Sequence, residues 1–194
     1  HMTGAQIARQ ILDGNGCQDV RIEAISGKLT DHFDPENGVL RLSSEVYSST
    51  SIAALGVAAH EAGHAIQDAQ SYAPLRIRST LVPIANIGSG AAIPLFMLGL
   101  IFSWQPLVEI GILCFALAVL FYVVTLPVEF NASHRALQTL ENEQLLYDDE
   151  LPGARKVLKA AALTYVAALL MSALQLLRYV LIFVGRNNRG RRDN

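Results

Sequence analysis

The stretch Ser51-Ile-Ala-Ala-Leu-Gly-Val-Ala-Ala-His60-Glu61-Ala-Gly-His64-Ala-Ile-Gln67 contains the pattern His-Glu-x-x-His. If the stretch is a helix, residues four apart lie one above the other on the same face, so His60 and His64 can reach one metal ion. Zn²⁺ binds neutral imidazole nitrogens at about 2.0–2.1 Å, and two such ligands one helical turn apart suit tetrahedral coordination. Glu61 then lies close enough to take a proton from a water molecule at the metal, which is the position of a general base.

The residues around this pattern favour a metal site over a solvated helix face. The helix is apolar nearly all round, because alanine or isoleucine occupies positions 58, 59, 62, 65 and 66, and this is typical of a buried helix. Ionisable side chains on a buried helix need a shared partner, since burying them alone is costly. Ser48 to Thr50 offer N-cap candidates, and we expect the helix to run to about Ala69.

Composition indicates a membrane protein. Of the 194 residues, 52% are hydrophobic and only 16% are charged, whereas a typical soluble domain carries about 25% charged residues. No charged residue occurs from Ser79 to Val108 or from Ile110 to Val128, and each run is long enough to cross a hydrocarbon core of about 30 Å. With Ser103-Trp-Gln-Pro106 as a turn and Trp104 as an interfacial anchor, the two runs predict a transmembrane helical hairpin.

A third apolar run extends from Ala160 to Leu177 and continues beyond Arg178. It predicts a long helix that spans the membrane, or that packs against the hairpin instead. The expected division of the chain is a domain at 1–78, the hairpin at 79–128, a helix and acidic loop at 129–153, and the long apolar helix with a basic tail at 154–194.

The polar N-terminal part predicts a small α+β domain. Thr3 to Gln6 resembles a capping box that begins a short amphipathic helix. Val20 to Ile25 alternates apolar and polar residues, which is typical of a half-buried strand. Asp34 to Gly38 has the composition of a turn, and Val39 to Leu42 is the expected returning strand. We therefore expect a short antiparallel sheet, with Val39 to Leu42 as an edge that either binds an extended peptide or is an ordinary sheet strand.

A catalytic zinc needs a third protein ligand. The extended pattern with a third histidine fails, because Gln67 and Gln70 stand where it has glycine and histidine. The remaining candidates are later glutamates: Glu109, Glu129, Glu141, Glu143 and Glu150. Glu109 lies near the far end of the hairpin, about a membrane thickness away. Glu129 ends the return helix, and a carboxylate beside an apolar run is costly unless something binds it, so we choose Glu129 over the alternative of an interfacial glutamate facing water.

Several longer motifs carry a family resemblance. They are Leu29-Thr-Asp-His-Phe-Asp-Pro35, Val39-Leu-Arg-Leu-Ser43, Gly56-Val-Ala-Ala-His-Glu-Ala-Gly-His-Ala-Ile-Gln67, Tyr72-Ala-Pro-Leu-Arg-Ile-Arg78 and Leu126-Pro-Val-Glu-Phe-Asn-Ala-Ser133. With them the chain resembles the YugP-like bacterial neutral zinc metallopeptidases and, more distantly, the HtpX-like membrane peptidases. The resemblance implies a zincin-like fold of the gluzincin type and zinc-dependent peptide hydrolysis. It also implies His60, His64 and Glu129 as zinc ligands and Glu61 as the base.

One position departs from the broader gluzincin pattern. Four residues after the glutamate ligand that pattern has an aspartate, which orients a ligand histidine, and this chain has Ser133. Such partners are worth about 10–100-fold in metal affinity or activity. Asn131 or another residue can take this role. His134 follows Glu129 by five residues, so it is turned about 140° away on a helix, and we expect it to face solvent. His32 precedes a turn, where it is exposed or faces the cleft.

The leading hypothesis is a membrane-embedded zinc endopeptidase that acts on a peptide or protein substrate associated with the lipid bilayer. The alternative is a catalytically silent zincin that binds membrane proteins as a scaffold, which the missing aspartate mildly favours. A channel or transporter subunit is disfavoured, because the apolar runs carry almost no ionisable residues. A net charge of −2 gives no basic patch for nucleic acid. Cys17 and Cys114 imply neither a disulfide nor a metal site.

Basic residues suggest the orientation of the chain in a bacterial plasma membrane. On the catalytic side they are Arg76, Arg78, Arg135, Arg155, Lys156 and Lys159, and after the last helix they are Arg186, Arg189, Arg191 and Arg192. If the last helix spans, this count favours a cytoplasmic catalytic face. His1-Met2 is typical of the remnant of a removed tag. We therefore expect the natural chain to begin earlier, with the further membrane helix that the family resemblance implies.

Overall fold

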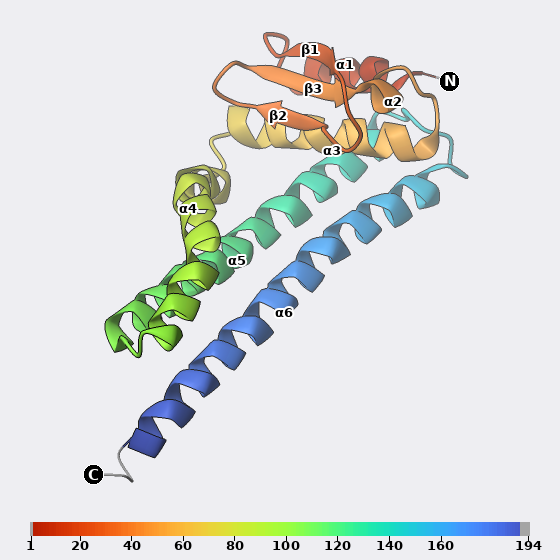
Figure 1. Cartoon of the computed structure of the whole chain (residues 1–194). Helices are drawn as coiled ribbons and strands as arrows, with labels where there is room; N and C mark the ends of the chain where they lie inside the picture. The colour runs from red at the N-terminus through yellow and green to blue at the C-terminus, as the bar shows by residue number, and fades with distance from the viewer. Residues whose placement is uncertain (1, 191–194) are drawn as a thin grey trace. The chain divides into compact units, whose positions relative to one another are not determined.

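The computed structural model describes residues 2–190 (Figure 1), so Arg191 and Arg192 of the expected basic tail lie outside the described residues. The elements are α1 (Gly4–Gly14), β1 (Arg21–Ile25), β2 (His32–Asp34), β3 (Val39–Ser43), α2 (Ser44–Tyr47), α3 (Ile52–Ala69), α4 (Ala73–Ile101), α5 (Gln105–Asn142) and α6 (Leu151–Gly190). They form two compact units. The first, here the N-terminal unit, comprises the chain up to Arg76 together with Pro127–Leu163, and the second, the apolar unit, comprises Ile77–Leu126 and the chain from Thr164.

The N-terminal unit has one hydrophobic core. The expected capping box is confirmed: the Thr3 hydroxyl accepts from the Gln6 amide and the Gln6 side chain accepts from the Thr3 amide, which begins α1. The amphipathic α1 buries one face against α3 and the sheet. The core also takes in the second half of α5 and the start of α6 through four fully or almost fully buried residues, Ala136, Leu140, Ala154 and Leu158.

The sheet is mixed, so the expected antiparallel sheet is wrong. The strand order is β1-β3-β2, with β1 parallel to β3 and β2 antiparallel to it. The turn at Asp34–Gly38 joins β2 to β3, and β1 pairs with the opposite side of β3. The sequence concealed this arrangement because β2 has only three residues and shows no alternation. The strand Val39–Ser43 is therefore central and has no free edge, and the edges are β1 and β2 (Figure 1).

Helix α3 ends at Ala69 as expected, but its N-cap is Ser51, not a residue of 48–50. The Ser51 hydroxyl accepts from the Ala54 amide. Midway along α3, Gly63 lies against α5: a Cβ built on Gly63 would be 2.6 Å from the carbonyl oxygen of Ala132. The absence of a side chain at Gly63 therefore lets the two backbones approach closely.

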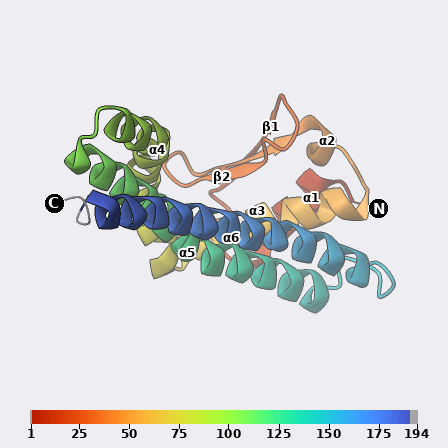
Figure 2. The ribbon, with the colours of Figure 1, turned by 60° about the horizontal axis from the view of Figure 1, so that its bottom comes forward.

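The apolar unit contains the helical hairpin that the sequence predicts. α4 and the first part of α5 run antiparallel around a short connection that includes Trp104 (Figures 1 and 2). The contact is close at Gly111, where a Cβ would be 2.7 Å from the Phe96 amide nitrogen. α6 joins this unit through Tyr179, which stacks on Phe96 with ring centroids 4.4 Å apart. Within residues 2–190, three helices (α4, α5 and α6) are long and apolar enough to cross a membrane.

The helix boundaries differ from expectation at two further places. α6 begins at Leu151, three residues before the expected start at 154, so Pro152 lies in its first turn. Proline is tolerated in the first turn of a helix, where its missing N–H has no intrahelical partner to lose. The four-residue helix α2 had no recognisable signal in the sequence.

The close approach at Gly63 gives a first prediction. Gly63→Ala places a methyl group against the Ala132 carbonyl, and we expect it to destabilise the protein by about 1–3 kcal/mol, because backbone has to move to admit it. The matched control is Gly56→Ala on the same helix, where a Cβ meets only ordinary contacts at 3.9 Å and helix propensity improves by up to about 1 kcal/mol. Thermal or denaturant unfolding in detergent measures both. Equal stability of the two variants would contradict the close approach of α3 and α5.

Candidate metal centre

His60, His64 and Glu129 lie together in the N-terminal unit. The first two come from consecutive turns of α3, and Glu129 comes from α5, just after the chain returns to this unit at Pro127. Glu129 Oε2 is 3.1 Å from His60 Nε2 and 3.6 Å from His64 Nε2. One donor atom from each residue lies within 4.8 Å of the other two. Among residues 2–190 this is the group of histidine and acidic side chains whose geometry suits a metal ion.

The donor set fits Zn²⁺. Bond lengths of about 2.0–2.1 Å in a tetrahedral site place neighbouring donor atoms about 3.4 Å apart, and the two observed separations lie on either side of that value. The Glu129 side chain is only 2% exposed, and the side chains of His60 and His64 are 14% and 9% exposed. A buried carboxylate is costly unless a cation or hydrogen-bond donors face it. Two imidazole nitrogens and one carboxylate oxygen leave a fourth position, as catalytic zinc requires.

The Ser133 side chain contacts His60. Its hydroxyl oxygen is 3.1 Å from His60 Nδ1, and the residue is 8% exposed. Because Ser133 follows Glu129 by four residues, both side chains project from the same face of α5 toward α3. The residue that replaces the expected aspartate thus contacts the ring nitrogen that faces away from Glu129.

His64 contacts Gln67, a residue whose place in the sequence indicated only that the pattern with a third histidine is absent. Gln67 follows His64 by three residues on α3, and its Oε1 is 2.9 Å from His64 Nδ1. The Gln67 Nε2 donates to the Val128 carbonyl and to Asn131 Oδ1, each at 2.9 Å. Asn131, suggested as a substitute for the aspartate, therefore contacts Gln67 and not the histidine itself. In the sequence, Gln67 stands out only as a polar residue on an apolar helix, which does not reveal its partners on α5.

Glu61 and the two other histidines are placed as follows. Glu61 follows His60 on α3 and is partly exposed. His134 is exposed on α5, as expected from its rotation away from Glu129. His32 lies on the edge strand β2, where its Nδ1 donates to the Thr30 carbonyl at 2.7 Å.

The rejected glutamates contact other groups. Glu109 accepts from Gln105 Nε2 at 2.8 Å, and Glu141 pairs with Arg155 at 3.9 Å. Glu150 accepts from the Tyr147 amide at 3.1 Å. None of them belongs to the triad.

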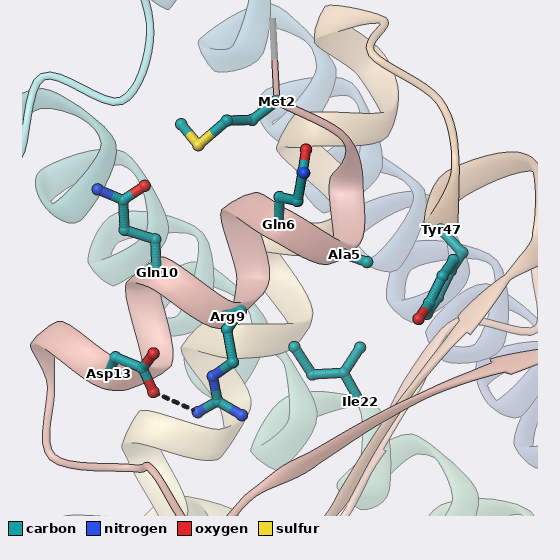
Figure 3. A pocket seen from close by; sticks show the side chains of 8 residues that line it. All are labelled: Met2, Ala5, Gln6, Arg9, Gln10, Asp13, Ile22 and Tyr47. Carbon is teal, nitrogen blue, oxygen red and sulfur yellow. Dashed lines mark ion pairs between the residues drawn. The ribbon is translucent and has the colours of Figure 1, made fainter.

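A separate hollow of about 560 Å³ lies on the outer face of α1 (Figure 3). It is lined by Met2, Ala5, Gln6, Arg9, Gln10, Asp13, Ile22 and Tyr47. The Arg9 guanidinium pairs with Asp13 at 2.7 Å and donates to the carbonyls of Val20 and Cys17. These contacts fasten α1 to the segment before β1, so the charged groups of this hollow serve the fold.

Comparisons with known proteins place the chain in a family. A family model described as "Putative neutral zinc metallopeptidase" matches residues 1–184. The chain is similar to the protein named "Putative membrane protease YugP" of Bacillus subtilis (strain 168), with 49% identity over 192 residues, which is 99% of this chain and 84% of the relative. No solved structure matches.

The contact of Ser133 with His60 gives a second prediction. Ser133→Ala removes the hydroxyl that faces His60 Nδ1, and we expect zinc affinity to fall about 10-fold, at the lower end of the effect of such partners. Competition with a chromophoric chelator, using the detergent-solubilised full chain, measures the change. Ser48→Ala, at an exposed serine of the same unit, is the matched control. Unchanged affinity in Ser133→Ala would mean that the hydroxyl does not orient the ligand.

Proposed function

The chain belongs to the family described as "Putative neutral zinc metallopeptidase", and from that premise we propose that it is a membrane-embedded zinc endopeptidase with a zincin-like catalytic unit. The observation that carries the proposal is the convergence of His60, His64 and Glu129, with Glu61 beside His60 on the same helix. Zinc implied by the family name suits these three donors. The substrate is a peptide or protein at the lipid bilayer.

The residues of the chain divide the reaction between them. His60, His64 and Glu129 hold the metal, which when bound lowers the pKa of a water molecule to about 7 and polarises the scissile carbonyl. Glu61 accepts the proton of the attacking water and passes it to the leaving amine, which is general base and then general acid catalysis. Ser133 contacts Nδ1 of His60, and Gln67 contacts Nδ1 of His64. These contacts hold the two imidazole rings in place.

The sheet offers a place for the substrate backbone. Because β3 is central, an extended peptide can add only at β1 or β2. Of these two edge strands β2 contacts α3, so a peptide paired with β2 runs alongside the helix that carries His60 and His64. Main-chain hydrogen bonds of this kind give affinity with little dependence on substrate sequence.

Three long apolar helices and the naming of the relative as a membrane protease support attachment to the bilayer. We propose that the catalytic unit faces the cytoplasm of a bacterial plasma membrane. Basic residues are more numerous on the catalytic side than after the last helix, and an excess of basic residues is typical of the cytoplasmic side.

The third prediction tests catalysis directly. Glu61→Gln keeps the shape of the side chain but removes the base, so we expect casein cleavage to fall by about 10²–10⁴-fold while bound zinc stays near one ion per chain. Removal of zinc by a chelator abolishes cleavage in the wild type, and added zinc restores it. Glu36→Gln, at an exposed turn residue, is the matched control and retains activity.

The same experiment separates the proposal from a silent scaffold. Zinc retained by the wild type without cleavage of casein or of several membrane-protein substrates would support the scaffold and overturn the peptidase. Loss of zinc in Glu61→Gln would mean that Glu61 is a metal ligand and not the base.

A further inference from the structure

Gln67 uses both ends of its amide in the buried contact between α3 and α5. The residue is fully buried. Its Nε2 lies 2.9 Å from two oxygens, the Val128 carbonyl and Asn131 Oδ1, and its Oε1 lies 2.9 Å from His64 Nδ1. Turning the amide over would face its oxygen toward the Val128 carbonyl and toward Asn131. The surroundings of Gln67 therefore fix which end points at the histidine.

Arg135 determines which atom of the Asn131 amide faces Gln67. Its Nε lies 2.7 Å from Asn131 Oδ1, and a guanidinium can only donate hydrogen bonds. The Asn131 atom between Arg135 and Gln67 must therefore be an acceptor, which is its carbonyl oxygen. Gln67 must then donate to it, and the Gln67 oxygen is left facing His64. His64 Nδ1 consequently carries a proton, and the lone pair of its neutral ring lies on Nε2, the nitrogen near Glu129.

Arg135 is itself held in place. Its guanidinium lies over the Tyr72 ring, 5.7 Å from the ring centroid, and a terminal nitrogen donates to Gln70 Oε1. Gln70 caps the C-terminal end of α3 and Tyr72 precedes α4. The arginine is thus tied to the segment that follows α3, although it belongs to α5.

We propose that Arg135, Asn131 and Gln67 form a relay that positions the candidate zinc ligand His64 and selects its Nδ1-protonated tautomer. The inference rests on the proposed zinc site and gives Arg135, which does not touch the triad, a part in orienting Gln67 beside that of the Val128 carbonyl. The two histidines differ in this respect. The Ser133 hydroxyl beside His60 can either donate or accept, so only His64 has its tautomer fixed by a donor-only group.

The relay makes different demands on its members, and these give the fourth prediction. Arg135→Met removes the donor, and Asn131→Leu removes the acceptor, so each is expected to weaken zinc binding by about 10-fold or more. Asn131→Asp keeps an oxygen that accepts from both neighbours, and its zinc affinity is expected to stay within about threefold of the wild type, well below the loss that such partners cause. Arg155→Met, at an exposed arginine of the same unit, is the matched control and is expected to leave zinc affinity unchanged.

Zinc affinity of the full chain in detergent is measured by chelator competition, together with the visible absorption of the Co²⁺-loaded protein and the melting temperature of the metal-free protein. The relay predicts weaker zinc binding and an altered Co²⁺ spectrum in Arg135→Met, both restored toward the wild type in Arg135→Lys, which still supplies a donor. Wild-type zinc affinity and spectrum in both Arg135→Met and Asn131→Leu would overturn the relay. If Arg135→Met or Asn131→Leu fails to fold, Asn131→Asp is compared with the one of the two that folds. The relay is overturned when Asn131→Asp binds zinc no better than that variant. A wild type that binds no zinc would instead overturn the proposed function.

Discussion

The close backbone contact between α3 and α5 is the constraint on which the site depends. Gly63 stands between His60 and His64 in sequence and faces Ala132 across the contact. A side chain at this position would hold the helices apart, and the donor atoms would no longer lie within reach of one ion. The contact also brings Glu129 and Ser133 to His60, and Val128 and Asn131 to Gln67. One small residue thus sets the geometry of the triad and of the hydrogen bonds behind it.

The polar groups at this contact are buried together, and each one limits the others. An ionised carboxylate as enclosed as that of Glu129 is unfavourable alone, so the two imidazoles and the metal they would bind are part of what stabilises the junction of α3 with α5. Gln67 presents two donors and one acceptor to three neighbouring groups, the Val128 carbonyl, Asn131 Oδ1 and His64 Nδ1. A hydrogen-bond network of this kind specifies one register of the helices, because a shift of either helix leaves buried groups without partners.

The sequence predicted the elements whose signals are periodic or chemical. The apolar runs predicted the hairpin, the Thr3–Gln6 pair predicted the start of α1, and the His-Glu-x-x-His spacing together with the return of the hairpin nominated the residues that the structure brings together. It failed where structure depends on pairing between distant segments. The three residues of β2 carry no alternation, so their place beside β3 was missed and β3 was wrongly given an edge. Gln67 was recognised only as a mismatch, because a hydrogen-bond partner on another helix leaves no local pattern.

The insertion of the hairpin between the two parts of the N-terminal unit has a physical consequence for the site. The chain leaves this unit after Arg76 and returns at Pro127, and the cost of closing a flexible loop grows with its length. A hairpin whose helices already run antiparallel returns the chain close to the point where it left, so much less freedom is lost when Glu129 meets His60. The close packing at Gly111 against Phe96, and at Gly99 against Val108, favours that antiparallel pairing. Assembly of the triad is therefore coupled to formation of the apolar hairpin through the chain itself, with no contact between the two units required.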